Sequence, residues 1–362
     1  MNISCGCAVS AALTLSLAVT CTATFVALTH DRTKRTKKVY PTNHQEVVLL
    51  DPVVSVVIPT CRRPRLVKRA VQSALNQSLR QIEVIVVIDG PDPATREALA
   101  TIKDSRLRVL ELPHNQGSCG ARNAGVAAAL AKWIAFLDDD DEWMLQKLEL
   151  QLEAIKQSVY SLPIVTCYLV VRSTQGECIW PRRVPSESEP LSEYLFVRHS
   201  FFQGEGLIQT STILTAKELL HKVPFLVDAQ KHDDWDWLLR ATTLEDVGVE
   251  FVHQPLSIWD FGETSQSLSR TIDWQCSFDW IQSKRDLVTP RAYSSFILAE
   301  VSSRAAKARQ WKAFFPLLWE ALRKGAPQPN DLFLYLGMWL IPPQLRIWLR
   351  TLLLKDRRAL ST

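Results

Sequence analysis

The chain has 362 residues, of which 47% are hydrophobic and 22% are charged, and its formal net charge is +4. This composition excludes a disordered chain and a strongly basic nucleic-acid-binding protein, and the length suits about two domains or one large α/β domain with an appendage. The eight cysteines are scattered, and the close pair Cys5 and Cys7 lacks the second pair of a zinc site. We therefore expect reduced thiols, as in a cytosolic domain.

Residues 1–30 predict an N-terminal membrane anchor. No charged side chain occurs from Ile3 to Leu28, and about 20 apolar residues suffice to cross a bilayer. A basic cluster follows between Arg32 and Lys38, so the positive-inside rule predicts a membrane-associated protein with the rest of the chain on the cytoplasmic side. A signal peptide or a non-native start are the alternatives, and residues 31–52 read as a basic linker.

From residue 53 onward, apolar runs of strand length alternate with amphipathic helical patterns, which is typical of βαβ units around a parallel sheet. We expect strands at 53–58, 83–88, 107–112 and 133–137 and helices at 66–75 and 121–131. Pro59 and Pro91 are expected to end the first two strands. Ligands of open α/β sheets bind at the carboxyl ends of strands, so the segments 59–62, 89–90 and 138–141 predict one site.

Four consecutive aspartates, Asp138 to Asp141, follow the last of these strands. Adjacent carboxylates at the end of a buried strand repel each other unless a cation neutralises them, and a hard divalent ion such as Mg²⁺ or Mn²⁺ suits oxygen ligands. The alternative is capping of a helix that carries Leu145, Leu148 and Leu152. Capping explains one or two of the four acids and leaves the others unexplained.

Two further polar segments are candidates for ligand contact. The segment 114–125 places glycines in a loop that opens a helix, a geometry suited to anions, with Arg122 available for phosphate. The polar run 209–212 either lines a sugar pocket or forms a polar strand edge.

The segments VSVVIPTCRRP, EVIVVIDGPD, NQGSCGARNAGVAAA, WIAFLDDDDEW and DDWDWLLR occur in an order and spacing that resemble inverting family 2 glycosyltransferases with the GT-A fold. The resemblance covers roughly residues 53–269. It implies a Rossmann-like mixed sheet flanked by helices, and transfer of a sugar from a nucleotide-diphosphate donor, a UDP-sugar, to a hydroxyl of a glycan, lipid-linked or envelope acceptor. It implies no nucleic-acid partner.

The resemblance also implies roles for individual residues. The loop after the first strand and the aspartate after the second hold the nucleotide base, which here means Pro59, Thr60, Arg62 and Asp89. The chain has Ile88-Asp89-Gly90-Pro91 where members often carry Asp-Asp-Gly-Ser, so one acid and the serine are absent.

By the same resemblance, Asp138 and Asp139 contact the ribose and Asp140 binds the metal, Mn²⁺ or Mg²⁺. The metal stabilises the negative charge that develops on the departing diphosphate. For Asp141, a helix-cap role and a role supporting the metal ligands stay open.

An inverting transfer also needs a base that takes the proton of the acceptor hydroxyl. The segment 232–240 matches the region that carries this base, and we predict Asp234, with Asp236 as the competitor and a helix N-terminal cap as the alternative role. Asp233 stands where glutamate is usual. On the acceptor side we expect Asp233, Trp235 and Trp259.

Residues 270–362 read as a helical extension. The basic, apolar segment 345–354 predicts an amphipathic helix on a membrane surface, and a helical lid packed on the sheet is the alternative. Two rival functions are a nucleotidyltransferase, which should carry a glycine-rich, lysine-bearing phosphate loop near the first strand, and a catalytically silent carbohydrate-binding or scaffold protein.

Overall fold

The computed structural model describes residues 51–173, 176–200, 204–229, 231–260, 273–342 and 345, all of which belong to one compact unit. The predicted anchor, the predicted domain boundary at residue 269 and the basic segment after residue 345 lie outside the described residues. These three therefore stay predictions. Among the residues described, no helix is both long enough and apolar enough to cross a membrane.

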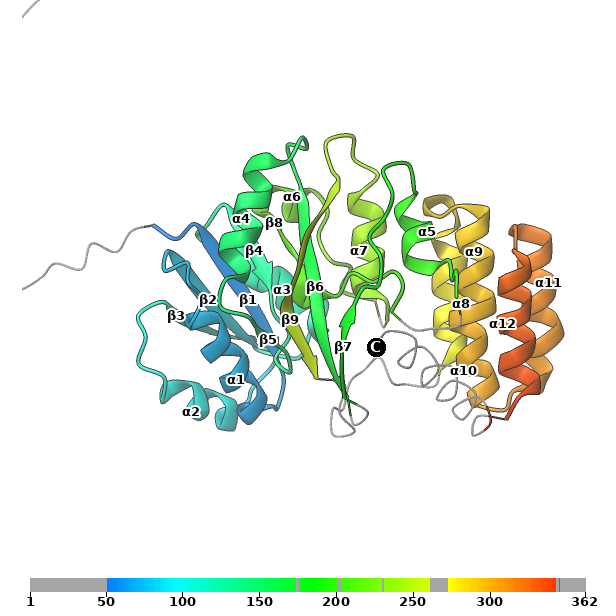
Figure 1. Ribbon diagram of the computed structural model, residues 1–362. Helices are drawn as coiled ribbons and strands as arrows, with labels where there is room; N and C mark the ends of the chain where they lie inside the picture. Colours follow the sequence, from blue (N-terminus) through cyan, green and yellow to red (C-terminus); the bar gives the residue numbers. More distant parts are fainter. Residues whose placement is uncertain are drawn as a thin grey trace, which may run out of the picture. The chain divides into compact units, whose positions relative to one another are not determined.

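The first half of the fold is a parallel sheet (Figure 1). β1 (Val54–Thr60) pairs with β2 (Ile82–Ile88) on one side and with β4 (Trp133–Phe136) on the other, and β3 (Leu107–Glu111) pairs with β2. The helices between these strands are α1 (Pro64–Leu75), α2 (Pro93–Ala100) and α3 (Gly117–Ala128). The predicted alternation of strands and helices is confirmed.

Pro59 does not end the first strand, because β1 continues to Thr60 and Pro59 pairs in register with Val87 of β2. A proline in a central strand ordinarily removes a ladder hydrogen bond. Here the β4 side of β1 is paired from Val54 to Val57, so Pro59 lies beyond that ladder. The missing N–H is tolerated for this reason.

The second half makes the sheet mixed, with strand order β3-β2-β1-β4-β8-β6-β9-β5 and β7 paired to β6. β8 runs antiparallel to both β4 and β6, and β9 runs parallel to β6. The bounds are β5 (Glu142–Trp143), β6 (Ile164–Ser173), β7 (Gly176–Trp180), β8 (Leu214–Ala216) and β9 (Val249–Asp260). This mixed sheet with flanking helices confirms the predicted GT-A fold class.

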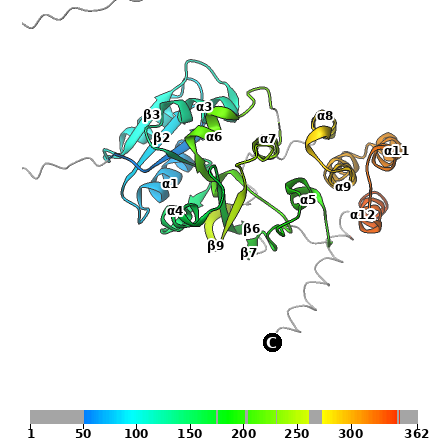
Figure 2. The same cartoon turned by 90° about the horizontal axis from the view of Figure 1, so that it is seen from above.

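The helices of the second half fall into two groups. Those that accompany the sheet are α4 (Lys147–Gln157), the 3₁₀ turn η1 (Thr210–Thr212), α6 (Lys217–Lys222) and α7 (Asp233–Ala241). The second group forms a helical region late in the sequence, and α5 (Leu191–Phe196), which comes earlier in the sequence, belongs to it (Figure 2). It contains α8 (Trp274–Ser283), η3 (Arg285–Leu287), α9 (Pro290–Phe296), the π-helical turn η4 (Ile297–Val301), α10 (Ser302–Lys307), η5 (Trp311–Ala313), α11 (Phe314–Lys324) and α12 (Pro329–Leu340).

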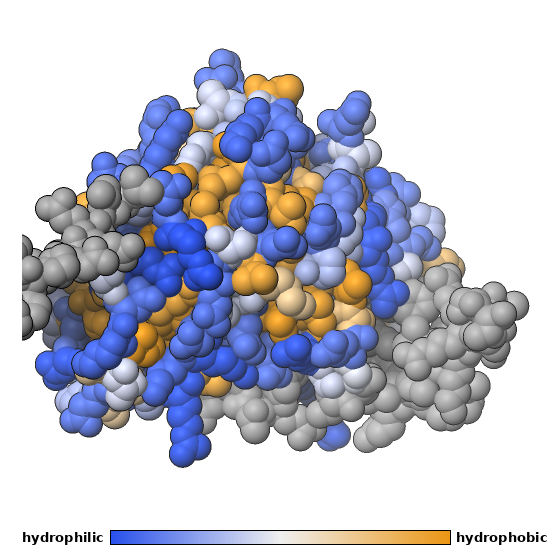
Figure 3. All heavy atoms as spheres, turned by 60° about the vertical axis from the view of Figure 1, so that its left-hand side comes forward, coloured by the Kyte–Doolittle hydropathy of each residue, from blue (hydrophilic) through white to orange (hydrophobic). Residues whose placement is uncertain are grey.

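Both faces of the parallel sheet are buried, so its strands are apolar throughout. Val56 and Ile58 point to the face covered by α1 and α4, whereas Val57 points to the face covered by α3 and α7. On the outer surface, Figure 3 shows that hydrophilic side chains interrupt the hydrophobic areas on the side that carries β3.

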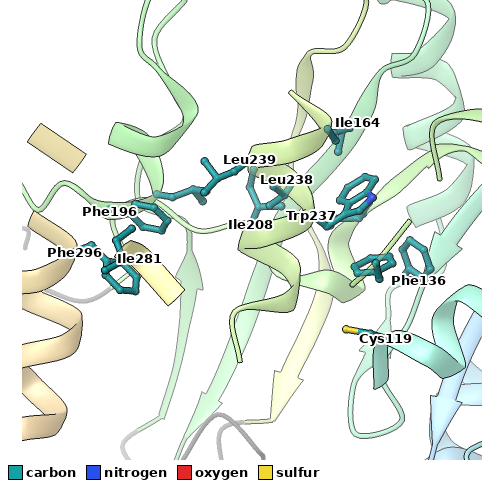
Figure 4. Packing of buried hydrophobic residues seen from close by; sticks show 14 of the residues in the cluster. Cys119, Phe136, Ile164, Phe196, Ile208, Trp237, Leu238, Leu239, Ile281 and Phe296 are labelled. Atoms are coloured by element: carbon teal, nitrogen blue, oxygen red, sulfur yellow. The ribbon is translucent and has the colours of Figure 1, made fainter. Parts of the chain in front are cut away.

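One continuous core joins the sheet to the C-terminal helices (Figure 4). It runs from Phe136 of β4 through Trp237 of α7 to Phe196 of α5, and on to Ile281 and Phe296 of α8 and α9. α7 is therefore packed between the sheet and the helical region. This placement matters because the acids of the predicted base region begin this helix.

Gly125 sets how closely α3 approaches β1. A Cβ at this position would lie 2.4 Å from Cγ1 of Val57, closer than real Cβ contacts allow. A glycine lets the two backbones pack at this distance. α3 is thus fixed against the central strand, and with it Arg122, one helical turn earlier.

Candidate active site

A buried arginine joins two of the predicted acidic segments. Nη2 of Arg122 donates to Oδ1 of Asp138 at 2.8 Å, and Nη1 donates to Oδ2 of Asp233 at 2.5 Å. Arg122 is only 4% exposed. Burial opposes its charge, but Asp138 and Asp233 raise the pKa of the guanidinium above its ordinary value. Arg122 thus bridges two carboxylates, and its predicted contact with a phosphate stays a prediction.

The loop after β1 also contacts the aspartate run. Thr60 Oγ1 donates to Oδ2 of Asp139 at 2.7 Å, and Nη1 of Arg63 lies 3.0 Å from Oδ1 of Asp139 and 3.2 Å from Oδ2 of Asp140. Two strand ends of the sheet are therefore cross-linked. Sequence reasoning chose Arg62 in this loop and missed Arg63, because nothing in the pair Arg62-Arg63 distinguishes the two.

Burial and neighbouring carboxylates disfavour the charged forms of Asp139 and Asp140. Burial and then the surrounding carboxylates raise the pKa of Asp139 to about 6, although Thr60 and Arg63 oppose the shift. Burial and then Asp138 raise the pKa of Asp140 as well. Asp140 nevertheless keeps a side chain that is 21% exposed, so it is open to a ligand from solvent.

Asp141 is fully buried and does not cap a helix. Its Oδ2 accepts hydrogen bonds from Gln209 Nε2 and from Ser211 Oγ, each at 2.6 Å, while Oδ1 has no hydrogen-bond partner. Burial, followed by the charges of Asp138 and Asp140, raises its pKa well above the ordinary value. The helix-cap alternative is wrong because β5 comes next and α4 begins only at Lys147.

Ser211 supports the aspartate run through hydrogen bonds. Its hydroxyl oxygen accepts the backbone N–H of Asp138 at 2.9 Å while its proton is donated to Asp141. Its carbonyl accepts Nε1 of Trp143 at 2.7 Å. The polar run 209–212 thus supports the acids through Gln209 and Ser211. Its polarity was the available signal, but the sequence did not show which segment it contacts.

The remaining residues predicted for the nucleotide base lie at the same sheet edge. Asp89 Oδ1 accepts the backbone N–H of Gln116 at 2.7 Å, which ties the end of β2 to the loop before α3. Arg62 has an exposed side chain and a left-handed backbone with φ of 57°, and its N–H donates to Asp92 Oδ2 at 2.9 Å. The predicted contacts of Pro59, Thr60, Arg62 and Asp89 with a nucleotide stay predictions.

The three acids in the first turn of α7 have different surroundings. Asp233 is held by Arg122 and by Ser118 Oγ at 3.1 Å, and Arg122 helps to lower its pKa although burial opposes this. Asp236 is buried between Arg240 at 2.6 Å and Lys284 at 2.7 Å, so it is a structural ion pair and not an available base. Burial and then Asp233 raise the pKa of Asp234 to about 7.

Asp234 therefore has the properties of a general base near neutral pH. Its Oδ1 accepts a hydrogen bond from the adjacent backbone N–H of Trp235 at 2.8 Å. No basic side chain forms an ion pair with it among the described contacts. A carboxylate with a pKa near the working pH combines a large unprotonated fraction with useful basicity. The geometry favours Asp234 over Asp233 and Asp236 for this role.

His232, which sequence reasoning did not select, anchors the start of α7. It adopts a left-handed φ of 60° and stacks on Trp235 with ring centroids 4.9 Å apart and an interplanar angle of 5°. Its Nε2 lies 2.9 Å from Ser277 Oγ of α8, and Trp280 and Phe296 pack around it. Burial, followed by Arg304 and Lys231, lowers its pKa to about 3.

The two tryptophans predicted for the acceptor side occupy separate places. Trp235 belongs to the aromatic cluster around His232, with Phe196 at 5.4 Å. Trp259, on β9, pairs edge-to-face with Trp180 at 6.1 Å. Both are only partly buried, and their contact with an acceptor stays a prediction.

Residues 55–205 match the model of the family described as Glycosyl transferase family 2. An uncharacterized glycosyltransferase of Haemophilus influenzae is 36% identical over 221 residues, which cover 60% of this chain and 83% of that protein. The amylovoran biosynthesis glycosyltransferase AmsB of Erwinia amylovora is 27% identical over 270 residues, which cover 70% and 87%. A shorter match of 102 residues at 33% identity, to the Escherichia coli UDP-Glc:alpha-D-GlcNAc-diphosphoundecaprenol beta-1,3-glucosyltransferase WfgD, covers 28% and 40%.

The neutral state of His232 predicts a pH dependence of stability. Between its folded pKa of about 3 and the ordinary value of 6.5, the unfolded chain holds a proton that the folded chain lacks, so stability is lost as pH falls below 6.5. His232→Phe keeps an aromatic ring and removes the titration. In urea unfolding from pH 6.5 downward, the free energy of unfolding of the native protein should fall more steeply than that of the variant, by up to about 1.4 kcal/mol per pH unit. Parallel slopes would contradict the burial of a neutral His232.

Proposed function

The chain belongs to glycosyl transferase family 2 and is a glycosyltransferase, and we propose that it moves a sugar from a UDP-sugar to a hydroxyl of a glycan or lipid-linked acceptor by a single inverting displacement. The observation that best supports this reaction is that neighbouring acids have different ion-pair partners and different pKa values. Arg122 forms ion pairs with both Asp138 and Asp233, while the neighbouring Asp234 has a carboxyl group with a pKa of about 7.

In the proposed reaction, Asp234 accepts the proton of the acceptor hydroxyl as the oxygen attacks the anomeric carbon of the donor. The bond between that carbon and the diphosphate oxygen breaks, and the UDP leaves from the opposite side. Asp233 contributes by keeping its negative charge beside Asp234, which raises the basicity of Asp234. Asp236 takes no part because Arg240 and Lys284 occupy it.

The aspartate run fits a divalent cation bound together with the donor. Asp140 would hold it, and the cation would neutralise charge on the departing diphosphate. The proposed fit is supported by the carboxylates of Asp139, Asp140 and Asp141, whose pKa values are raised by burial and then by neighbouring carboxylates, and by the unpaired Oδ1 of Asp141. Within the described ranges, no three His, Cys, Asp or Glu side chains group as a metal site. Mg²⁺ characteristically uses one or two carboxylates, with substrate phosphates and water completing its coordination.

The donor and acceptor classes are supported by the relatives. The name of the Escherichia coli relative gives UDP-Glc as the donor and a diphosphoundecaprenol-linked sugar as the acceptor, and AmsB is named for amylovoran biosynthesis. For this chain we infer a nucleotide-sugar donor and an acceptor from envelope polysaccharide synthesis. Membership of the family argues against the nucleotidyltransferase alternative, and the retained Asp140 and Asp234 argue against a silent scaffold.

The first test concerns the base. Asp234→Asn should lower kcat by about 10²–10⁴-fold while UDP binding stays close to native, because only proton transfer is removed. In the native protein, kcat/KM should fall as pH drops below about 7, since protonated Asp234 cannot accept a proton. Asp228→Asn, an exposed acid before α7, is the matched control. Normal turnover of Asp234→Asn would show that another group is the base.

The second test concerns the cation. Asp140→Asn should weaken Mn²⁺-dependent binding of UDP by about tenfold or more, measured by titration calorimetry with and without Mn²⁺. The control Glu245→Gln removes an exposed carboxylate on the loop before β9 and should leave the affinity unchanged. If Asp140→Asn binds UDP and Mn²⁺ as tightly as the native protein, the assignment of Asp140 is wrong.

A further inference from the structure

The two helices that end the described chain expose large apolar side chains. On α11, Phe315 is 77%, Trp319 65% and Leu322 50% exposed, and on α12 Phe333 is 62% and Leu340 64% exposed. In Figure 1 and Figure 2 these helices form the layer of the helical region that lies farthest from β3. Large apolar side chains exposed together in this way mark a surface that contacts something else.

The exposed residues follow helical spacing and are not needed by the core. Phe315, Trp319 and Leu322 are separated by four and three residues, so they share one face of α11. The opposite faces supply the packing: Leu317 and Ala321 of α11 are buried, as are Tyr335 and Trp339 of α12.

The two helices are joined through those inner faces. The hydroxyl of Tyr335 donates to the carbonyl of Phe314, and the rings of Trp311 and Trp339 lie 5.3 Å apart. α11 and α12 are thus held together without using Phe315, Trp319 or Phe333. Each helix has a stable inner face and a second apolar face directed outward.

The segment that carries this surface has more basic than acidic residues. From residue 302 to 342 the sequence has six Lys or Arg and two acids. Both acids are engaged: Glu320 bonds Lys324 Nζ at 2.8 Å and the Tyr293 hydroxyl at 2.7 Å, and buried Asp331 accepts Ser295 Oγ at 2.7 Å. Lys312 and Arg323, which flank the exposed residues of α11, are exposed.

We propose that the outer face of α11 and α12, formed by Phe315, Trp319, Leu322, Phe333 and Leu340, docks on the surface of an anionic bilayer. Tryptophan, phenylalanine and leucine on one side, with Lys and Arg at the margin, are the composition of interfacial membrane helices. Each basic residue close to an anionic leaflet adds to the attraction. A second copy of the chain fits less well, because a two-fold contact through this face would bring the same basic margins together.

The proposed docking depends only on the outer face of α11 and α12, whichever sugar and acceptor the enzyme uses. It also differs from the predicted N-terminal anchor, because docking would fix the orientation of the helical region on the membrane. Since the same core joins that region to α7, docking would also orient the acids of the active site relative to the lipid surface.

Hydroxyl-radical footprinting of the full chain tests the proposal. Binding to vesicles that contain phosphatidylglycerol should reduce oxidation of Trp319 and Phe333 at least severalfold, while Tyr160, which is 40% exposed in the loop between α4 and β6, should be oxidised as before. Vesicles of phosphatidylcholine alone should protect Trp319 and Phe333 much less. The readout is specific to these side chains, so binding through the N-terminal segment does not mimic it.

A matched pair of variants completes the test. Phe315→Ser combined with Trp319→Ser should abolish the protection of Phe333, whereas Leu130→Ser combined with Val159→Ser, two equally exposed apolar positions near the sheet, should preserve it. Unchanged oxidation of Trp319 in vesicle-bound protein overturns the proposal. Protection that appears without vesicles and grows with protein concentration assigns the face to a second copy and also overturns it, as does equal protection by neutral vesicles.

Discussion

The ion-pair bridge made by Arg122 determines how the acids of this protein are arranged. A guanidinium with 4% exposure is tolerated only when its charge is compensated, and Asp138 and Asp233 provide that compensation from two separate parts of the chain. Because Gly125 lets α3 pack closely against β1, the position of Arg122 is fixed relative to the sheet. The start of α7 is thereby fixed relative to the end of β4, which brings the two acidic segments into one site.

Differences in the partners of each carboxylate explain why neighbouring acids behave differently. Asp233 and Asp236 have cationic partners, while Asp234, one residue from the first, has none among the described ion pairs and carries a raised pKa. Environments that push the pKa values of adjacent groups apart are a general way of assigning acid and base roles. The aspartate run follows the same logic, since Asp141 is locked by Ser211 and Gln209 and Asp140 remains partly open to solvent.

The helical region also supports the start of α7. His232 is packed among Trp280 and Phe296 and bonded to Ser277, so the residue before the first turn of α7 is held by helices that come later in the sequence. Lys284 pairs with Asp236 of α7 and adds a second connection. The active-site acids therefore depend on contacts from both the sheet and the helices, which agrees with a single continuous core.

Local patterns were enough for the parallel half of the fold. Strands buried on both faces give unbroken apolar runs, and the run of aspartates marks a strand end whatever its partners are. What local patterns do not reveal involves partners distant in sequence. The helix expected to carry Leu145 begins only at Lys147 because Glu142 pairs with Ile258 in β9, and the ion pair between Arg122 and Asp233 joins residues that lie 111 positions apart. Ser211 and His232 were missed for the same reason.

A double-mutant cycle between Arg122 and Asp233 tests most directly whether this bridge organises the site. Arg122→Met leaves Asp138 and Asp233 without their shared cation and should destabilise the fold by about 3 kcal/mol, whereas Asp233→Asn leaves the buried guanidinium with Asp138 alone and should destabilise the fold less. Once one partner is absent, removing the other costs less, so the double variant should be more stable than the sum of the single changes predicts, by about 1.5–3 kcal/mol in the free energy of unfolding. Additivity to within about 0.5 kcal/mol would contradict the account, because it would mean that the two side chains do not act together.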